Sequence, residues 1–216
     1  PEADAVGTGA DAMGGHHLAR GRVDSATAAQ HDWAAMPFAD RAAVFLKAAD
    51  LLAGPWRQVI NAATMLGQSK TAYQAEIDSA CELIDFFRLN VHFAERLYEE
   101  QPFSSPGIWN RMDHRPLEGF VYAITPFNFT AIGGNLPTTP AILGNVAVWK
   151  PAASALLSNW YVYKLLEAAG LPPGVINFVP GSAAQVSDLL LADRRLAGIH
   201  FTGSTEVFQS LWRTVG

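Results

Sequence analysis

The hydrophobic pattern divides this chain into two parts. From Ser25 to Glu100 apolar residues recur at helical spacing, whereas residues 119–216 alternate between short apolar runs and amphipathic stretches. Recurrence at positions i, i+3, i+4 and i+7 is typical of helices, and short apolar runs bounded by turns are typical of buried strands. The pattern therefore predicts a helical N-terminal part followed by an α/β part.

Three helices are predicted in the first part. One covers residues 37–52, with Pro37 in a starting position, and a second covers residues 56–66. The third spans residues 71–100, and its apolar stripe comprises Ile77, Cys81, Ile84, Phe87, Val91 and Phe93. At least three acidic residues of this helix are expected on a solvated face, whereas Glu82 lies at the edge of the buried stripe.

Residues 1–31 show little hydrophobic periodicity, and the helical pattern begins only at Ser25. The segment Gly7–Ala12 imitates a dinucleotide-binding fingerprint, but no strand precedes it and no apolar helix follows, so we reject it. The histidines of this part have no second cluster of ligand residues and are expected to be exposed; they are His16, His17 and His31. No metal site is predicted.

The second part has the alternation of a parallel α/β domain. Strands are predicted over residues 120–125, 146–150, 175–179 and 196–202, and helices over residues 136–143, 155–169 and 183–192 and from about residue 204. Apolar strands separated by helices predict a partial Rossmann-like parallel sheet with helices on both faces. The carboxyl ends of such strands lie along one edge, where ligands bind.

The Pro- and Gly-containing residues 101–118 are expected to be a connector or hairpin. We therefore expect two units: residues 1–118, an N-terminal helical region and connector, and residues 119–216, a partial dinucleotide-binding domain.

The composition excludes several classes of partner and of fold. Half of the chain is apolar, the net charge is -5 and Cys81 is its one cysteine. These values predict a folded protein with no nucleic-acid partner, no membrane partner and no disulfide framework.

Candidate chemistry lies at the predicted strand ends. Asn128 stands between two phenylalanines just after the first strand. It is either a turn asparagine that bonds local backbone or a donor to a developing oxyanion. Lys150 ends the second strand and is either a surface lysine or a donor to ribose or phosphate. Residues 201–207 form either a plain capped helix start or an anion site for a pyrophosphate.

Other reactive side chains have weaker support. Cys81 lies on the apolar stripe and is expected to be a small core residue, because nothing adjacent would lower its pKa. No motif in the sequence assigns a carboxylate or nucleophile partner to His114 or His200, so we give neither a general-base role.

Three ordered motifs resemble the aldehyde dehydrogenase superfamily: Thr125-Pro-Phe-Asn-Phe-Thr130, Trp149-Lys-Pro-Ala152 and Phe201-Thr-Gly-Ser-Thr205. The form of the first motif and the segment Ala75–Arg88 resemble its delta-1-pyrroline-5-carboxylate (L-glutamate γ-semialdehyde) dehydrogenase branch. The similarity runs from about Ala29 to the end. It implies NAD-dependent oxidation of L-glutamate γ-semialdehyde to L-glutamate in proline breakdown, through a cysteine thiolate.

The resemblance also implies residue roles. Asn128 would be the oxyanion donor, Phe129 would line the aldehyde pocket and Glu82 would hold the substrate's amino group. The implied cofactor contacts are Thr125, Lys150, Gly203, Ser204, Thr205, Glu206 and Val207. A glutamate that many members carry soon after the Lys-Pro pair is absent here, so NAD rather than NADP rests on the branch alone.

The nucleophilic cysteine and general-base glutamate of the family follow the third motif, and this chain reaches Gly216 before either. We therefore expect an N-terminal fragment that is inactive by itself, since Cys81 lies in the wrong place. The parent would be a homo-oligomer of the cytoplasm, or of the mitochondrial matrix in a eukaryote. Two alternatives stay open: a non-catalytic dinucleotide-binding module, and a dehydrogenase for another aldehyde.

Overall fold

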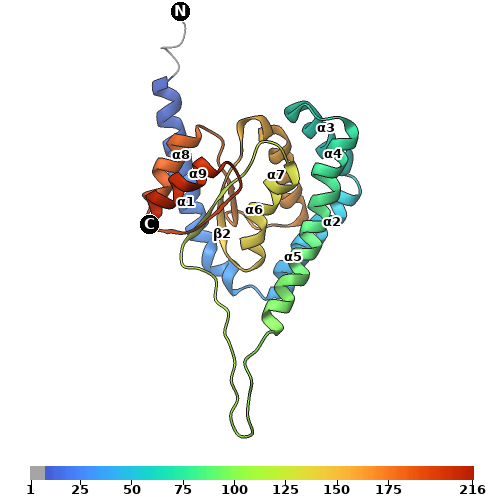
Figure 1. Ribbon diagram of the computed structural model, residues 1–216, viewed down its shortest axis with the longest axis vertical. Helices are drawn as coiled ribbons and strands as arrows, with labels where there is room; N and C mark the ends of the chain where they lie inside the picture. The colour runs from blue at the N-terminus through green and yellow to red at the C-terminus, as the bar shows by residue number, and fades with distance from the viewer. Residues whose placement is uncertain (1–7) are drawn as a thin grey trace, which may run out of the picture.

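The computed structural model describes residues 8–216, and the side chains from residue 17 onward (Figure 1). Its helices are α1 (Thr8–Ala35), α2 (Phe38–Ala53), α3 (Arg57–Gln68), α4 (Ala72–Ala75), α5 (Glu82–Glu99), α6 (Thr130–Ile142), α7 (Leu156–Ala169), α8 (Ala183–Leu191) and α9 (Thr205–Val215). A π-helical segment, η1 (Glu76–Cys81), joins α4 to α5, and a 3₁₀ turn, η2 (Ala153–Ala155), precedes α7. The strands are β1 (Phe120–Ile124), β2 (Val146–Lys150), β3 (Ile176–Phe178) and β4 (Leu196–Phe201).

The four strands form one parallel sheet in the order β3-β2-β1-β4. Helices α6 and α7 cover one face, and α2, α3 and α5 pack outside them; α1 and α8 lie on the other face (Figure 1). The predicted fold class, a partial Rossmann-like parallel sheet between helices, is confirmed. Ile124 is in register with both Lys150 and Phe201, so the ends of three strands lie side by side.

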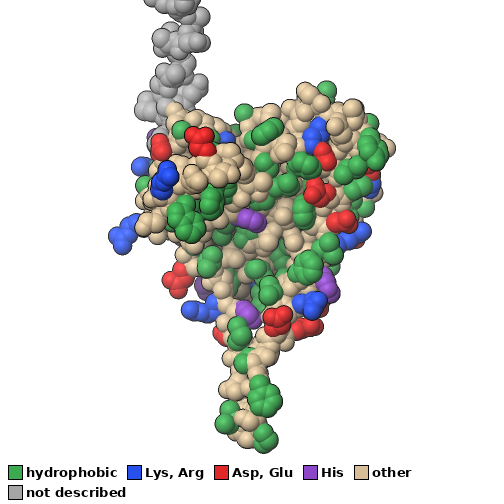
Figure 2. All heavy atoms as spheres, viewed as in Figure 1, with side chains coloured by type: hydrophobic (Ala, Val, Ile, Leu, Met, Phe, Trp, Pro, Cys, Tyr) green, Lys and Arg blue, Asp and Glu red, His purple; other side chains and the backbone are tan. Residues whose placement is uncertain are grey.

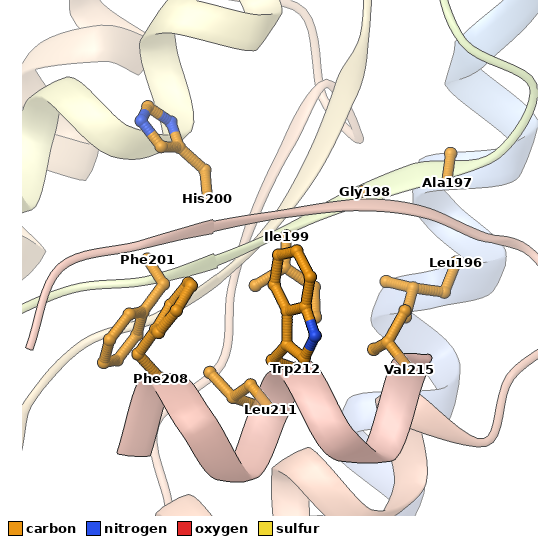
Figure 3. A pocket seen from close by; sticks show the side chains of 10 residues that line it. All are labelled: Leu196, Ala197, Gly198, Ile199, His200, Phe201, Phe208, Leu211, Trp212 and Val215. Atoms are coloured by element: carbon orange, nitrogen blue, oxygen red, sulfur yellow. The ribbon is translucent and has the colours of Figure 1, made fainter. Parts of the chain in front are cut away.

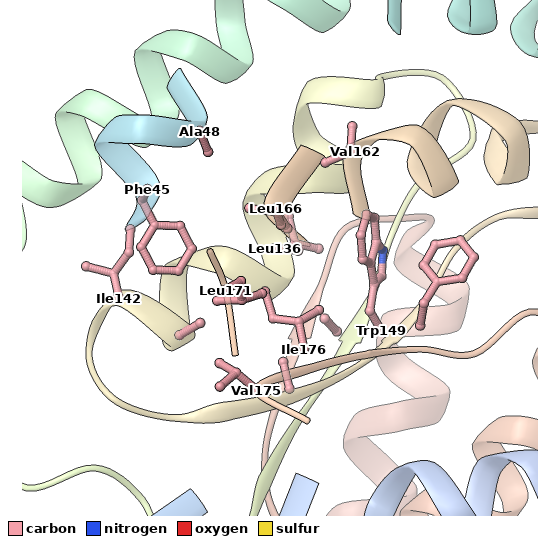
Figure 4. Packing of buried hydrophobic residues seen from close by; sticks show 14 of the residues in the cluster. Phe45, Ala48, Leu136, Ile142, Trp149, Val162, Leu166, Leu171, Val175 and Ile176 are labelled. Atoms are coloured by element: carbon pink, nitrogen blue, oxygen red, sulfur yellow. The ribbon is translucent and has the colours of Figure 1, made fainter. Parts of the chain in front are cut away.

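A continuous hydrophobic core joins the sheet to the N-terminal helices (Figure 4). Trp149 of β2 is fully buried, and its ring meets Phe178 edge-on with the centroids 5.0 Å apart. Phe45 of α2 and Leu166 of α7 belong to the same cluster. Each such side chain stabilises the fold by about 1.5–3 kcal/mol. The core contains residues from both sides of the expected domain boundary at residue 118 and does not by itself separate two domains. The boundary stays a prediction.

Helix α1 corrects the expectation that helix begins only at Ser25, because it starts at Thr8. Its buried stripe consists of Ala19, Val23, Ala26 and Trp33, which recur at helical spacing. Two of these four are alanines, so the stripe is hidden in a generally Ala-rich segment. His17 and His31 are exposed as expected. The side chain of His16, and Gly7 of the rejected fingerprint, lie outside the described residues.

Helix α6 begins at Thr130, six residues before the predicted start at residue 136. Gly133 and Gly134 in the missed stretch concealed the start of the helix, because glycine is unfavourable in helix interiors. The structure explains the glycines. A Cβ on Gly133 would lie 2.3 Å from Asn159 Oδ1, and one on Gly134 would lie 2.9 Å from Leu83. Small residues therefore allow α5 and α7 to approach α6 closely.

The segment predicted as one helix over residues 71–100 is continuous but changes geometry at η1. A π-turn holds one more residue than an α-turn, so the stripe before η1 does not continue in register after it. Ile77, within η1, is 44% exposed for this reason. Phe93 is 54% exposed because it lies two residues, about 200° of regular helix, beyond buried Val91. Both corrections remove these residues from the predicted apolar stripe. Leu83 is fully buried on the core side.

Residues 101–118 form a long ribbon that projects from the body of the molecule, as the predicted connector or hairpin (Figure 1). Hydrophobic side chains lie along it in the space-filling view, and Phe103 and Trp109 are 83% and 77% exposed (Figure 2). The backbone N–H of Asn110 donates to Ser104 Oγ across the ribbon, at 2.9 Å. Within residues 8–216, the structure has no helix with the length and apolarity that crossing a bilayer requires.

Candidate active site

The carboxyl edge of the sheet brings the predicted cofactor residues together. The Thr125 N–H donates to the Lys150 carbonyl at 3.2 Å, and the Thr202 N–H donates to the Ile124 carbonyl at 3.2 Å. These bonds extend the ladders beyond β1 and β4. They place Thr125, Lys150 and the turn at Gly203 at neighbouring positions on one edge, as the alternation of strands and helices predicted.

The turn after β1 is anchored from below by a buried tryptophan. Thr125 is only 4% exposed, and its Oγ1 accepts a hydrogen bond of 3.1 Å from Trp149 Nε1. A buried hydroxyl with a buried partner has little freedom to rotate. The backbone that leads to Asn128 therefore starts from a fixed point.

Asn128 lies on the surface of this turn, between exposed Phe127 and half-buried Phe129. Among the described residues no hydrogen bond to the Asn128 amide is found. The interpretation as a turn asparagine required such a local bond. The amide instead remains available to an incoming group.

Thr130, the first residue of α6, is the centre of a buried polar cluster directly after Asn128 and Phe129. Its Oγ1 lies 2.8 Å from Thr64 Oγ1, accepts from Gln68 Nε2 at 2.8 Å and donates to Ser158 Oγ at 2.9 Å. Thr130, Thr64 and Ser158 are fully buried. The cluster ties the start of α6 to α3 and α7, and so fixes the far side of the turn.

We expect Thr130→Val to lower the free energy of unfolding by about 2–3 kcal/mol, because it leaves buried polar partners unsatisfied. Valine keeps the shape, so lost packing contributes little. Urea unfolding of the full-length protein measures this change in the free energy of unfolding. Thr64→Val, which removes one bond of the same cluster, is the matched control, with an expected cost of about 1 kcal/mol. Equal stability of Thr130→Val and the wild type would contradict a structural role for the cluster.

Lys150 is buried at the end of β2, with 6% of its surface exposed. Burial lowers the pKa of its ammonium group, and no ion pair to it is found within the described part of the chain. The interpretation as an ordinary surface lysine is therefore not supported. A desolvated cation without a counter-charge is suited to an anionic or hydroxyl-rich ligand.

The end of β4 has the geometry of a capped helix start. Ser204 is the N-cap of α9, and its Oγ accepts from the Val207 N–H at 3.3 Å. Gly203 makes a close approach to Phe201: a Cβ there would lie 2.4 Å from the tip of the Phe201 ring, so that ring would have to shift. Thr205, Glu206 and Val207 are exposed, so the first turn of α9 is open to solvent.

Helix α9 also flanks an apolar hollow of about 450 Å³ against β4 (Figure 3). Ile199, Phe208 and Trp212 line it, and none of the predicted site residues does. His200 points away from Ile199, Phe208 and Trp212, and its Nδ1 lies 2.8 Å from the Leu136 carbonyl (Figure 3). This contact accounts for His200 as a structural residue that ties β4 to α6.

Glu82 and Phe129 lie around a common neighbour, Lys70. The Lys70 ammonium group lies 4.3 Å from the centre of the Phe129 ring and forms an ion pair with Asp78. Glu82 is half-buried, and its Oε2 is buried without a hydrogen-bond partner within the described residues. Burial raises the pKa of Glu82; Asp78 acts in the same direction, and Lys70 opposes both.

Cys81 is half-buried rather than a full core residue. Its Sγ accepts from Arg57 Nη2 at 3.4 Å, yet burial and the nearby Glu76 raise the pKa of the thiol. A raised pKa disfavours the thiolate, so the thiol is unsuited to nucleophilic attack. Sequence reasoning missed Lys70 and the cluster around Thr130, because their partners are far apart along the chain and follow no motif.

Comparison with known proteins establishes the family of this chain. The sequence profile of the aldehyde dehydrogenase family matches residues 11–216. The chain belongs to the aldehyde dehydrogenase family.

Individual relatives narrow the similarity. The chain is 59% identical to the mitochondrial delta-1-pyrroline-5-carboxylate dehydrogenase of Emericella nidulans over 191 aligned residues, which are 88% of this chain and 33% of the relative. It is 54% identical to the mouse enzyme of the same name, in an alignment that covers 89% of this chain and 34% of the mouse enzyme. A crystal structure of the Mycobacterium tuberculosis delta-pyrroline-5-carboxylate dehydrogenase bound with NAD superposes on this chain with a TM-score of 0.91 and 65% sequence identity. The superposition covers 93% of this chain and 38% of that structure's chain. The chain thus spans about one third of the length of these relatives.

Proposed function

We propose that this chain supplies the oxyanion donor and the cofactor edge of an NAD-dependent dehydrogenase that oxidises L-glutamate γ-semialdehyde to L-glutamate in proline breakdown. One observation carries the proposal. Thr125, Asn128, Lys150 and the capped start of α9 lie at adjacent strand ends of one parallel sheet. The names of the similar enzymes support the substrate, and the NAD-bound neighbour supports the cofactor.

The residues at this edge fit a dinucleotide. Lys150 is largely buried and has no ion pair within residues 8–216, so its ammonium group is available to ribose hydroxyls or phosphate, and Thr125 stands beside it. The first turn of α9, from Gly203 to Val207, offers backbone N–H groups to a pyrophosphate, where the helix dipole favours negative charge. NAD, when bound, accepts the hydride that leaves the reacting carbon.

Asn128 acts on the substrate oxygen. As a nucleophile adds to the aldehyde, negative charge develops on that oxygen, and the side-chain amide donates a hydrogen bond to it. The turn is fixed at Thr125 and at Thr130, so the donor needs little reorganisation when the charge appears. We assign the nucleophile to no residue of this chain, because the Cys81 thiol is disfavoured as a thiolate.

Glu82 and Phe129 select the substrate. The unpartnered Oε2 of Glu82 is suited to the α-ammonium group of glutamate semialdehyde, because a buried carboxylate oxygen gains most from a charged donor. The ring of Phe129 faces the aliphatic part. A simple aldehyde lacks the ammonium group and would leave Glu82 unpaired, so the amino-acid aldehyde is favoured over the alternative of another aldehyde.

The proposal also covers the organisation, assembly and location of the whole protein. Residues 1–118 and 119–216 are the helical region and the dinucleotide-binding unit. The whole protein forms a homo-oligomer, for which the exposed aromatic side chains of the ribbon at residues 101–118 provide apolar surface. It acts in the cytoplasm, or in the mitochondrial matrix in a eukaryote, as the names of several relatives suggest.

NAD binding tests the cofactor edge directly. We expect Lys150→Met to weaken NAD binding at least about tenfold, since a hydrogen bond to a charged group contributes roughly 1.5–3 kcal/mol. The free energy of unfolding should stay equal or rise, because the variant removes a buried unpaired charge. Calorimetry with NAD on the full-length protein measures the first quantity, and urea unfolding measures the second.

Lys164→Met is the matched control, because Lys164 is an exposed lysine of α7 paired with Glu167. It should leave NAD affinity unchanged. Equal NAD affinity of Lys150→Met and the wild type would contradict the cofactor edge. Tight NAD binding without any aldehyde oxidation would instead favour the alternative of a non-catalytic dinucleotide-binding module.

A further inference from the structure

Lys70 lies where three elements meet beside the proposed substrate residues. It follows Ser69, which ends α3 in the left-handed conformation with φ 55°. Its ammonium group pairs with Asp78 of η1 and lies over the ring of Phe129, 4.3 Å from the centroid. The side chains of Lys70 and Asp78 are only 13% and 16% exposed. This one cation therefore joins the end of α3, the π-helical segment and the turn after β1.

The backbone around Lys70 is unusual on both sides. Ser69 is the one non-glycine residue with positive φ in the described part of the chain, and such residues tend to be retained at functional sites. The π-turns of η1 end at Cys81, immediately before Glu82, and π-helical segments are likewise frequent at functional sites. The two irregular segments therefore lie on either side of the Lys70–Asp78 pair, and Glu82 follows the second of them.

The charges in this region are two carboxylates and one ammonium group. Asp78 and Lys70 form a nearly buried pair, whereas Glu82 has a buried oxygen with no hydrogen-bond partner in the described part of the chain. Two close carboxylates disfavour each other's ionised form, and an adjacent cation relieves this repulsion. Without Lys70, Asp78 would act on Glu82 unopposed.

We propose that Lys70 is a positioning residue for the amino-group site: it neutralises Asp78, leaves Glu82 as the carboxylate that receives the substrate's ammonium group, and holds the ring of Phe129 in place. This inference rests on the proposed function, which supplies the roles of Glu82 and Phe129. Lys70 acts through these two residues and touches no reacting atom. The cation–ring contact adds a modest attraction of its own.

The test compares two ligands that differ by one ammonium group. L-glutamate, the proposed product, carries it, and glutarate has the same two carboxylates without it. Calorimetry on the full-length protein gives the Kd of each ligand between about pH 5 and pH 8.5, with each Kd corrected for protonation of the free ligand's own carboxylates, which titrate at roughly pH 4 to 5.5. L-glutamate binding should weaken as the pH falls and Glu82 takes up a proton; we call this loss of affinity at low pH the acid limb. Glutarate binding should show no acid limb that depends on Glu82.

In Lys70→Met, loss of the cation raises the pKa of Glu82, so Glu82 is protonated at a higher pH. The acid limb of L-glutamate binding should therefore move up by about one pH unit. Lys70→Arg keeps the charge and should keep the wild-type limb. Adding Asp78→Asn to Lys70→Met removes the opposing carboxylate and should return the limb toward the wild-type pH.

Three results would overturn the proposal. One is a Lys70→Met limb that coincides with the wild type while Glu82→Gln still weakens L-glutamate binding, in which case Lys70 alone is misassigned. Another is an equal loss for L-glutamate and glutarate that Asp78→Asn does not reverse, which indicates general distortion. The third is unchanged L-glutamate affinity in Glu82→Gln, which removes the proposed substrate site together with the role of Lys70.

Discussion

Replacing Asn128 with alanine is expected to lower kcat for aldehyde oxidation about 10²- to 10³-fold, the loss that follows removal of one oxyanion donor. The turn that carries Asn128 is held by Trp149 on one side and by the Thr130 cluster on the other. The variant therefore removes the donor without displacing the backbone. Because the amide acts on charge that develops during the reaction, KM should change much less than kcat.

Steady-state kinetics of the full-length protein measure both constants. Phe127→Ala is the matched control, since Phe127 is the preceding residue of the same turn, is 66% exposed and offers no side-chain donor. NAD affinity should be unchanged in both variants. If kcat of Asn128→Ala stayed within about threefold of the wild type, the amide would not be an oxyanion donor of the expected strength.

Gly119→Ala is expected to have the largest effect on folding, with a loss of more than about 4 kcal/mol in the free energy of unfolding. Gly119 precedes β1 with φ +114°, and a Cβ there would lie 2.0 Å from the Arg195 carbonyl oxygen. The same oxygen accepts the Phe120 N–H at 2.9 Å, so the clash opens the first bond between β1 and β4. The obstacle is backbone, which cannot move aside cheaply.

Gly107→Ala separates the clash from the backbone conformation. Gly107 lies in the projecting ribbon with φ +81°, and an added Cβ there meets nothing within 4 Å. It should cost only the left-handed strain, about 1–2 kcal/mol. Thermal and urea unfolding of both variants measure the cost of the clash at Gly119 against the cost of left-handed strain alone at Gly107. A Gly119→Ala protein as stable as Gly107→Ala would contradict the close approach of β1 to the backbone at Arg195.

The strands were predictable because each is an apolar run between turns, and β2 was predicted with its observed bounds. The start of α6 was not, because its glycines are required by contacts with Leu83 and Asn159 that lie far away in the sequence. The stripe of α5 was misplaced at Ile77 because a π-turn breaks the regular period. Local periodicity thus predicts elements whose geometry is regular and fails where tertiary contacts decide.

The site shows the same division. Motif resemblance predicted roles for Asn128, Lys150 and Glu82. In the structure Lys150 ends β2, Glu82 begins α5, and Asn128 lies in the turn between β1 and α6. It could not identify Lys70, because nothing near Lys70 in the sequence indicates that its ammonium group meets both Asp78 and Phe129. The burial of Lys150 was equally invisible, since it depends on how β2 is covered.

The central claim is that this sheet edge serves an amino-acid aldehyde with NAD as the oxidant. It is tested most directly by the rate of NADH formation from L-glutamate γ-semialdehyde and from butanal, with the full-length wild-type protein and Glu82→Gln. We expect the wild type to prefer the semialdehyde about 100-fold or more in kcat/KM, and Glu82→Gln to lose most of that preference, since a charge-assisted hydrogen bond contributes roughly 1.5–3 kcal/mol. Equal kcat/KM for the two aldehydes, or a preference that survives Glu82→Gln intact, would contradict the account.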